Sequence, residues 1–152
     1  MWKVPRIWED GEVWIIGGGP SIPYLFDVPE NIIEIVTKRK GSPSKFSPYM
    51  SKLHGKHTIG INMAYTLGSW IDMVVFGDRG FYLSNRVALS KFTGIKVSVN
   101  PGHKGGQFAK EGIKHLSRGG KRYGISDHPD TVCWNGNTGA AAISVAVHAG
   151  AK

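Results

Sequence analysis

One stretch decides the fold expected for this chain: Val13-Trp14-Ile15-Ile16-Gly17-Gly18-Gly19-Pro20-Ser21. Four consecutive apolar residues are typical of a parallel strand whose two faces are both covered. The three glycines allow positive φ and let a ligand approach the backbone, because no Cβ atoms intervene. Pro20 lacks an amide hydrogen, and Ser21 can cap a helix or contact a ligand. Phosphates bind at such strand ends in open α/β sheets, although a plain strand-to-helix turn has the same pattern.

This first strand is expected at about 12–17, and three more are expected at 57–62, 73–77 and 96–100. Each ends at Gly, Asn or Asp. Residues 81–92 have the apolar spacing of an amphipathic helix. Residues 140–150 form a small-residue helix, for which Asn137 or Thr138 is the expected N-cap. The start of that helix, Asn137 to Gly139, would present amides and a positive dipole end to an anion. This alternation predicts an α/β fold whose parallel sheet carries a site at one edge.

The other segments are harder to assign. Residues 21–26 are expected to begin a short helix, while 31–40 fits a helix or a strand. Residues 41–56 contain two prolines and four serines, which predicts a long, flexible loop that covers a ligand. His54 and His57 have no third ligand at suitable spacing, so no metal site is expected. In the glycine-rich segment 101–130, residues 123–125 are expected to form an edge strand.

Composition places the chain among single-domain globular proteins, spanning residues 1–152. No apolar run is long enough for a membrane span, and no signal-peptide core is present at the N-terminus. A lone cysteine, Cys133, excludes an internal disulfide and fits a reducing, cytoplasmic location. Residues 37–126 carry sixteen basic and three acidic groups within a net charge of +8. This surplus favours a solvated or anion-attracting surface over a dedicated nucleic-acid site, which stays possible.

The order of these motifs resembles a Rossmann-like superfamily. Its members include bacterial sialyltransferases of the Campylobacter type, motility-associated flagellin glycosyltransferase-like proteins and hydroxymethylpterin diphosphokinase-like proteins, with bacterial and phage relatives. The resemblance rests on Gly-Gly-Gly-Pro-Ser, Gly-Ile-Asn at 60–62, an acidic strand tip at Asp78, and Asn-Thr-Gly-Ala-Ala at 137–141. It implies a three-layer α/β/α fold with a mostly parallel sheet. Because a strand would normally follow a helix that ends at Gly150, the domain is expected either to end there or to be C-terminally shortened.

The resemblance also implies a function: a nucleotide- or nucleotide-sugar-binding domain of the glycosyltransferase type, taking a CMP-sugar donor and requiring no metal. The binding residues it implies are Gly17, Gly18, Gly19, Pro20, Ser21, Asn62, Asp78, Asn137, Thr138 and Gly139. Two alternatives stay open. One is a binding protein that keeps the fold without the chemistry, and the other is a diphosphokinase-like phosphotransferase using Mg²⁺ held by Asp78.

The chain departs from the family pattern at two places. Gly18 stands where the sialyltransferases have Asn, which removes one expected ligand contact. Their catalytic histidine lies beyond the equivalent of the last helix, where this sequence ends. The catalytic residues are therefore unassigned, with Asp78, His103 and His128 as the candidates, and a loop histidine is more often an exposed bystander. The oligomeric state, the base and the acceptor do not follow from the sequence.

Overall fold

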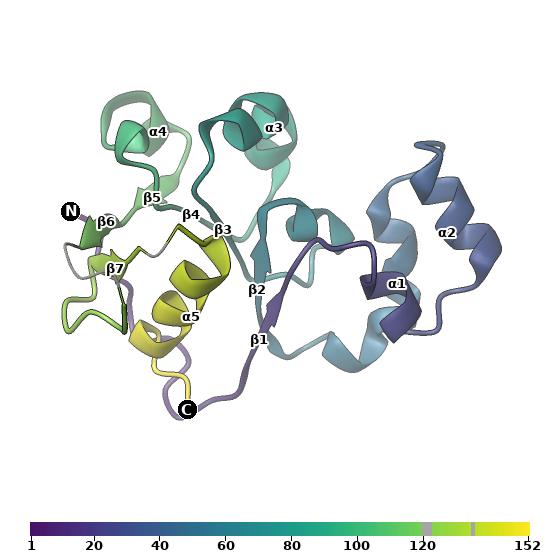
Figure 1. Ribbon diagram of the computed structural model, residues 1–152, viewed down its shortest axis with the longest axis horizontal. Helices are drawn as coiled ribbons and strands as arrows, with labels where there is room; N and C mark the ends of the chain where they lie inside the picture. Colours follow the sequence, from purple (N-terminus) through teal and green to yellow (C-terminus); the bar gives the residue numbers. More distant parts are fainter. Residues whose placement is uncertain (120–122, 135) are drawn as a thin grey trace.

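The computed structural model of this chain describes residues 1–119, 123–134 and 136–152 (Figure 1). At its centre lies a sheet of five parallel strands in the order β1-β2-β3-β4-β5. The strands are β1 (Val13–Ile16), β2 (His57–Ile61), β3 (Met73–Phe76), β4 (Ile95–Ser98) and β5 (Ile113–His115). The predicted α/β fold with a parallel sheet is confirmed. Lys121 and Arg122 of the basic segment, and Asn135 before the last helix, lie outside the described residues.

The strand order explains how the two faces of the sheet are covered. Strands that follow one another in sequence and in space, joined by right-handed crossovers, place every connection on the same face. The elements in those connections are α1 (Ile22–Leu25), α2 (Glu30–Thr37), η1 (Pro43–Leu53), η2 (Asn62–Leu67), α3 (Arg79–Lys91), η3 (Pro101–His103) and α4 (Gly106–Lys110). The last helix, α5 (Thr138–His148), covers the opposite face (Figure 1). The result is a Rossmann-like three-layer α/β/α fold.

The core follows this division, because neighbouring residues of a strand point to opposite faces. Met73 and Val75 of β3 pack in the cluster that contains Val145 of α5. Val74 and Phe76 of the same strand pack in a different cluster, with Tyr82 and Leu89 of α3 and Ile113 of β5. All four central β3 residues are fully buried, as a strand covered on both faces requires.

Helix α5 forms where the sequence predicts it. Asn137 is its N-cap, and Gly150 has the φ of +100° typical of a residue just beyond a helix C-terminus. Ala141, Ala142 and Val145 are completely buried. Their small side chains let the helix backbone lie close to the sheet, so α5 contacts β1, β2 and β3.

The prediction of a flexible loop over residues 41–56 is wrong. Most of this segment is the 3-10 helix η1, whose Phe46, Met50 and Leu53 are buried with Ile33 of α2. Pro43 stands in its first turn, where proline is tolerated, and the Ser42 hydroxyl accepts a hydrogen bond from the Ser44 amide. Pro43 and Ser42 therefore mark the beginning of a helix, whereas Pro48 lies inside it. The ambiguous segment at 31–40 is also helical, as α2.

The edge strand predicted at 123–125 is wrong as well. These residues form a bend, with φ of +88° at Gly124. A second, two-stranded parallel sheet is formed instead by β6 (Ser117–Gly119) and β7 (Thr131–Cys133). Within the described residues, no helix is both long enough and apolar enough to cross a membrane.

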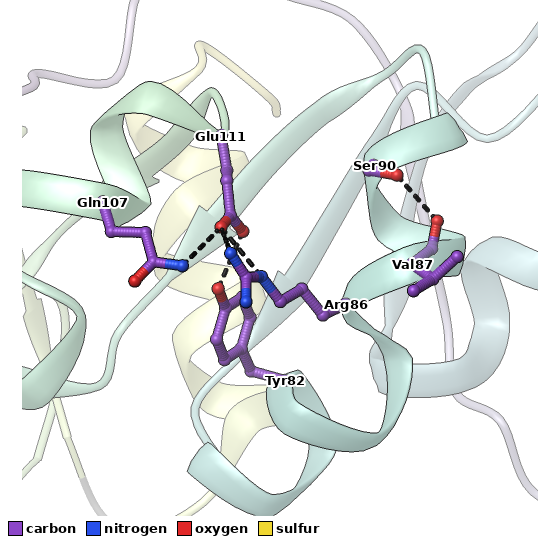
Figure 2. A network of polar contacts seen from close by, with 6 residues as sticks. All are labelled: Tyr82, Arg86, Val87, Ser90, Gln107 and Glu111. Atoms are coloured by element: carbon purple, nitrogen blue, oxygen red, sulfur yellow. Dashed lines mark hydrogen bonds and ion pairs between the residues drawn. The ribbon is translucent and has the colours of Figure 1, made fainter.

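A polar network fastens α4 to α3 (Figure 2). Both oxygens of Glu111, which follows α4, accept hydrogen bonds: one from the Tyr82 hydroxyl at 2.7 Å, the other from Arg86 at 2.6 and 2.9 Å and from Gln107 at 3.0 Å. Burial alone would raise the pKa of Glu111, but these hydrogen bonds and the charge of Arg86 outweigh it and lower the pKa. The carboxylate is therefore held in its charged form.

We expect the substitution Glu111→Gln to lower the free energy of unfolding by about 1–2 kcal/mol at pH 7, because a charge-assisted network loses its acceptor. Since the folded-state pKa of Glu111 is lowered, its contribution is fully present above its ordinary pKa of 4.5 and is lost as the pH falls through the folded value. Urea unfolding at pH 7 and pH 4 measures both effects. Glu34→Gln, which breaks the exposed Glu34–Lys38 pair, is the control and should change stability little.

Candidate functional site

The carboxyl ends of the parallel strands bring together segments that are distant in the sequence. The glycine turn follows β1, and Asn62 follows β2. A Cβ atom placed on Gly18 would lie 3.6 Å from the Ala64 amide nitrogen, so the turn lies against the start of η2. A Cβ atom placed on Gly139 would lie 3.8 Å from Ile61 Cδ1, so the start of α5 also lies over the end of β2. The glycine turn, Asn62 and the α5 N-terminus therefore all lie near the carboxyl end of β2.

The glycine turn is open to its surroundings. Gly17, Gly18 and Gly19 are exposed, and none of them adopts the left-handed conformation that glycine permits. A Cβ atom on Gly17 would meet nothing within 4 Å, and one on Gly19 would meet only Ser21 Oγ at 3.9 Å. Neither the backbone conformation nor internal packing thus requires glycine here. Because these residues have no side chains, the space over their backbone is free.

Several hydrogen-bonding groups of the turn have no partner within the described residues. Among the described residues, none accepts a hydrogen bond from the backbone amides of Gly17, Gly18 or Gly19. Pro20 has no amide hydrogen to offer. Ser21 stands in the capping position of α1 but makes no side-chain capping bond, because its backbone is already helical. Of the two roles predicted for Ser21, capping is excluded, and its hydroxyl lies exposed beside the turn.

Asn62 has two unusual features. Its φ is +51°, a left-handed conformation that asparagine tolerates better than most residues. Its side-chain oxygen Oδ1 is buried and has no hydrogen-bond partner in the described part of the chain. Buried acceptors without partners are rare in folded proteins and mark strain, ordered water or a ligand. As an acceptor, Oδ1 needs a donor, such as a sugar hydroxyl or a base N–H.

The other polar residues at the strand ends act as helix caps. Asp78 Oδ1 accepts a hydrogen bond from the Gly80 amide at 2.6 Å and begins α3. Asn137 Oδ1 accepts from the amides of Gly139 at 2.7 Å and Ala140 at 3.4 Å and begins α5. These oxygens satisfy amides that a helix start leaves without partners. Their place at the strand ends is thus explained without a ligand.

Asn100, which the sequence analysis does not assign to the site, has the same capping role. Its Oδ1 accepts from the Gly102 amide at 2.8 Å, and its Nδ2 donates to the Gly77 carbonyl at 2.9 Å. It thereby ties the ends of β3 and β4 together.

The two histidine candidates lie in different surroundings. His128 is exposed and precedes the amino end of β7, at the opposite end of that strand from α5. His103 is 1% exposed, so the expectation of an exposed loop histidine does not hold for it. Its ring stacks on Phe108, its Nδ1 lies 2.8 Å from Ser98 Oγ, and its Nε2 is buried with no partner among the described residues.

A second histidine, His115, lies near His103. His115, at the end of β5, has two buried ring nitrogens without hydrogen-bond partners in the described chain. Burial lowers the pKa of His103, and the nearby His115 and Arg79 lower it further. Burial also lowers the pKa of His115, and the charges of Lys104 and Arg118 lower it further. A polar contact with the Asn100 backbone, which lies outside hydrogen-bond geometry, raises this pKa in part. Both rings are therefore held neutral.

Arg118 is a residue of this edge that sequence reasoning missed. Its guanidinium lies 3.9 Å from the Trp134 ring centroid and donates to the carbonyls of Val99 at 2.7 Å and Gly77 at 3.3 Å. No carboxylate in the described residues pairs with it. Burial lowers the pKa of this guanidinium, which has only carbonyls as hydrogen-bond partners among the described residues and adds a cation near the carboxyl edge of the sheet. Its strand, β6, has only three residues and gives no periodic signal.

No group of three or more His, Cys, Asp or Glu side chains in the described residues is arranged to hold a metal ion. Asp78 is a single carboxylate with one oxygen engaged in capping.

Comparisons with known proteins give no match: no protein-family model fits the chain, and searches of curated proteins and of solved structures find no significant similarity.

The neutral histidine pair predicts a loss of stability in mild acid. The folded-state pKa values of both histidines are lowered, so the folded protein has its full stability above about pH 6.5, the ordinary histidine pKa. As the pH falls below that value toward the folded-state pKa, the free energy of unfolding decreases. We expect His103→Gln to reduce the difference in unfolding free energy between pH 7.5 and pH 5.5. Urea unfolding at both values measures it. An unchanged pH dependence in His103→Gln would contradict the assignment.

Proposed function

We propose that this chain binds a nucleotide or a nucleotide sugar at the carboxyl edge of its sheet. The ligand's phosphate lies at the glycine turn, and its sugar or base donates a hydrogen bond to Asn62. The observation that carries the proposal is the buried, unpartnered Oδ1 of Asn62 beside an open turn of unpartnered backbone amides. A phosphorylated sugar matches both requirements, because it offers acceptor oxygens to the amides and donor hydroxyls to the amide oxygen.

Several features support a phosphate at the turn. Backbone amides without Cβ atoms in front of them can approach phosphate oxygens closely. The N-terminal end of α5 adds a positive dipole, although Asn137 already occupies the amides of Gly139 and Ala140. Thr138 begins this helix and is partly exposed there. Arg118, which has no carboxylate partner among the described residues, adds positive charge to the same edge of the sheet.

The sequence resemblance extends the proposal to a glycosyltransferase-like domain that takes a CMP-sugar donor. The polar groups of the turn suit such a donor, because they require no metal to hold a single phosphate. We assign no catalytic residue: Asp78 caps a helix, His103 is enclosed by aromatic rings, and His128 lies before the amino end of β7. The proposal is thus one of ligand binding, with glycosyl transfer as the chemistry it would serve.

The substitution Asn62→Gly tests this proposal. Glycine accepts the left-handed backbone and removes the buried oxygen, so the melting temperature without ligand should stay within about 2 °C of the parent. A ligand at ten times its Kd stabilises by roughly 1.4 kcal/mol, or about 3–5 °C for a chain of this size. We expect CMP at millimolar concentration to give such a shift in the parent protein and none in Asn62→Gly, as measured by differential scanning fluorimetry.

Asp10→Gly is the matched control. Asp10 has a similar positive φ of 58° but lies before β1, at the other end of the sheet, where its side chain forms an exposed ion pair with Lys152 and its amide, which glycine retains, donates to the Gly150 carbonyl. It should retain the full CMP shift. Absence of a shift in the parent with CMP, other nucleotides and nucleotide sugars would exclude the proposed function. A shift that persists in Asn62→Gly would exclude the role of Asn62.

A further inference from the structure

A pocket of about 350 Å³ lies beside the glycine turn. One wall is the turn itself, from Gly18 to Pro20, and another is η2 from Met63 to Leu67. Helices α1 and α2 and the start of η1 complete it, through Pro23, Ile33, Val36 and Phe46 among others. Asn62 immediately precedes Met63 of the wall, so the pocket adjoins the place where a ligand is proposed to bind.

The side chains that line this pocket are mostly apolar. None of the described residues that line it carries a charge. Two of the three wall hydroxyls already donate to the backbone: Thr37 Oγ1 to the Ile33 carbonyl at 2.8 Å and Thr66 Oγ1 to the Met63 carbonyl at 2.7 Å. The third belongs to Tyr24, which is 59% exposed. A nucleobase placed in this pocket would lose its hydrogen bonds to water without replacing them, which is costly.

Size and exposure narrow the occupant further. A cavity of about 150 Å³ lined by aliphatic and aromatic side chains holds benzene, so a pocket of about 350 Å³ has room for a bicyclic ring or a comparable aliphatic group. Wall residues Tyr24 and Met63 leave 59% and 43% of their surface in water. Covering such apolar surface stabilises a complex in proportion to its area.

We propose that this pocket binds the apolar group of a second small molecule, an uncharged aromatic or branched aliphatic alcohol whose hydroxyl lies at the glycine turn. The inference rests on the proposed function in one respect, because it places this molecule beside the phosphate of the nucleotide. The hydroxyl is assigned to the turn because the carbonyls of Gly18 and Pro20, two lining residues, accept no backbone hydrogen bond within the described residues, while the turn amides are left to the phosphate. The nucleobase lies outside the pocket.

The probe for this proposal is 2-naphthol, a bicyclic alcohol of the required size. Isothermal titration calorimetry should show saturable binding of one 2-naphthol per chain. The substitution Val36→Trp places a large ring in the pocket from the α2 side and should weaken this binding by about tenfold or more. Leu83→Trp is the matched control. Leu83 is a 60% exposed residue of α3 that does not line the pocket, so the variant should bind 2-naphthol like the parent.

The same titration repeated with saturating CMP separates the two proposals. We expect 2-naphthol to bind with little change in affinity when CMP is present, and the CMP shift to persist in Val36→Trp. Absence of 2-naphthol binding, or equal binding in Val36→Trp, would overturn the pocket assignment whatever CMP does. Displacement of 2-naphthol by CMP would place the nucleobase in the pocket and overturn it as well. If 2-naphthol binds but no nucleotide changes the melting temperature, the pocket assignment stands and the proposed nucleotide binding is excluded.

Discussion

All strands of the parallel sheet end at one edge, and this places many unpaired backbone amides close together. Each helix that follows a strand begins with amides that have no partner within the helix. The chain supplies acceptors from its own side chains: Asp78 for α3, Asn100 for η3 and Asn137 for α5. The polar strand ends are therefore first of all a consequence of the fold. A ligand is needed to explain only what these caps do not.

Among the described groups that these caps do not explain, two stand directly after β1 and β2. The glycine turn after β1 has amides without acceptors among the described residues, and Asn62 after β2 has a buried oxygen without a donor. They lie next to each other, because the turn packs against the start of η2. One missing acceptor and one missing donor at the same place are complementary to a single polar ligand. This pairing distinguishes Asn62 from the capping residues Asp78, Asn100 and Asn137, although all four stand at or near strand ends.

Much of the fold could be predicted from local patterns. The strands at β1 to β4 are short apolar or alternating segments followed by Gly or Asn, and α5 has a capping residue before it and a glycine after it. The serines and prolines of 41–56 are typical of a loop, whereas burial of Phe46, Met50 and Leu53 stabilises the helical turns of η1, which is kinked at Met50. Strands β5, β6 and β7 have three residues each, too few for a period, and they form only by pairing with distant segments.

The sequence predicts part of the candidate site. The glycine turn and Asn62 follow directly from their positions after strands, but the sequence cannot separate a capping asparagine from an unpartnered one. That difference depends on backbone angles, since Asn62 is left-handed whereas Asn137 is extended. Arg118 and His115 belong to strands that no local signal reveals, so their place at the same sheet edge required the three-dimensional structure.

The central claim is that the open turn and Asn62 form one binding site. Amide chemical shifts of the isotope-labelled protein, followed by NMR during titration with CMP, test it most directly. The account predicts saturable changes concentrated at Gly17 to Gly19, at Asn62 including its side-chain amide, and at Thr138 and Gly139. Changes confined to the capped residues Asp78 and Asn100, or to the basic surface, or no saturable changes at all, would contradict it.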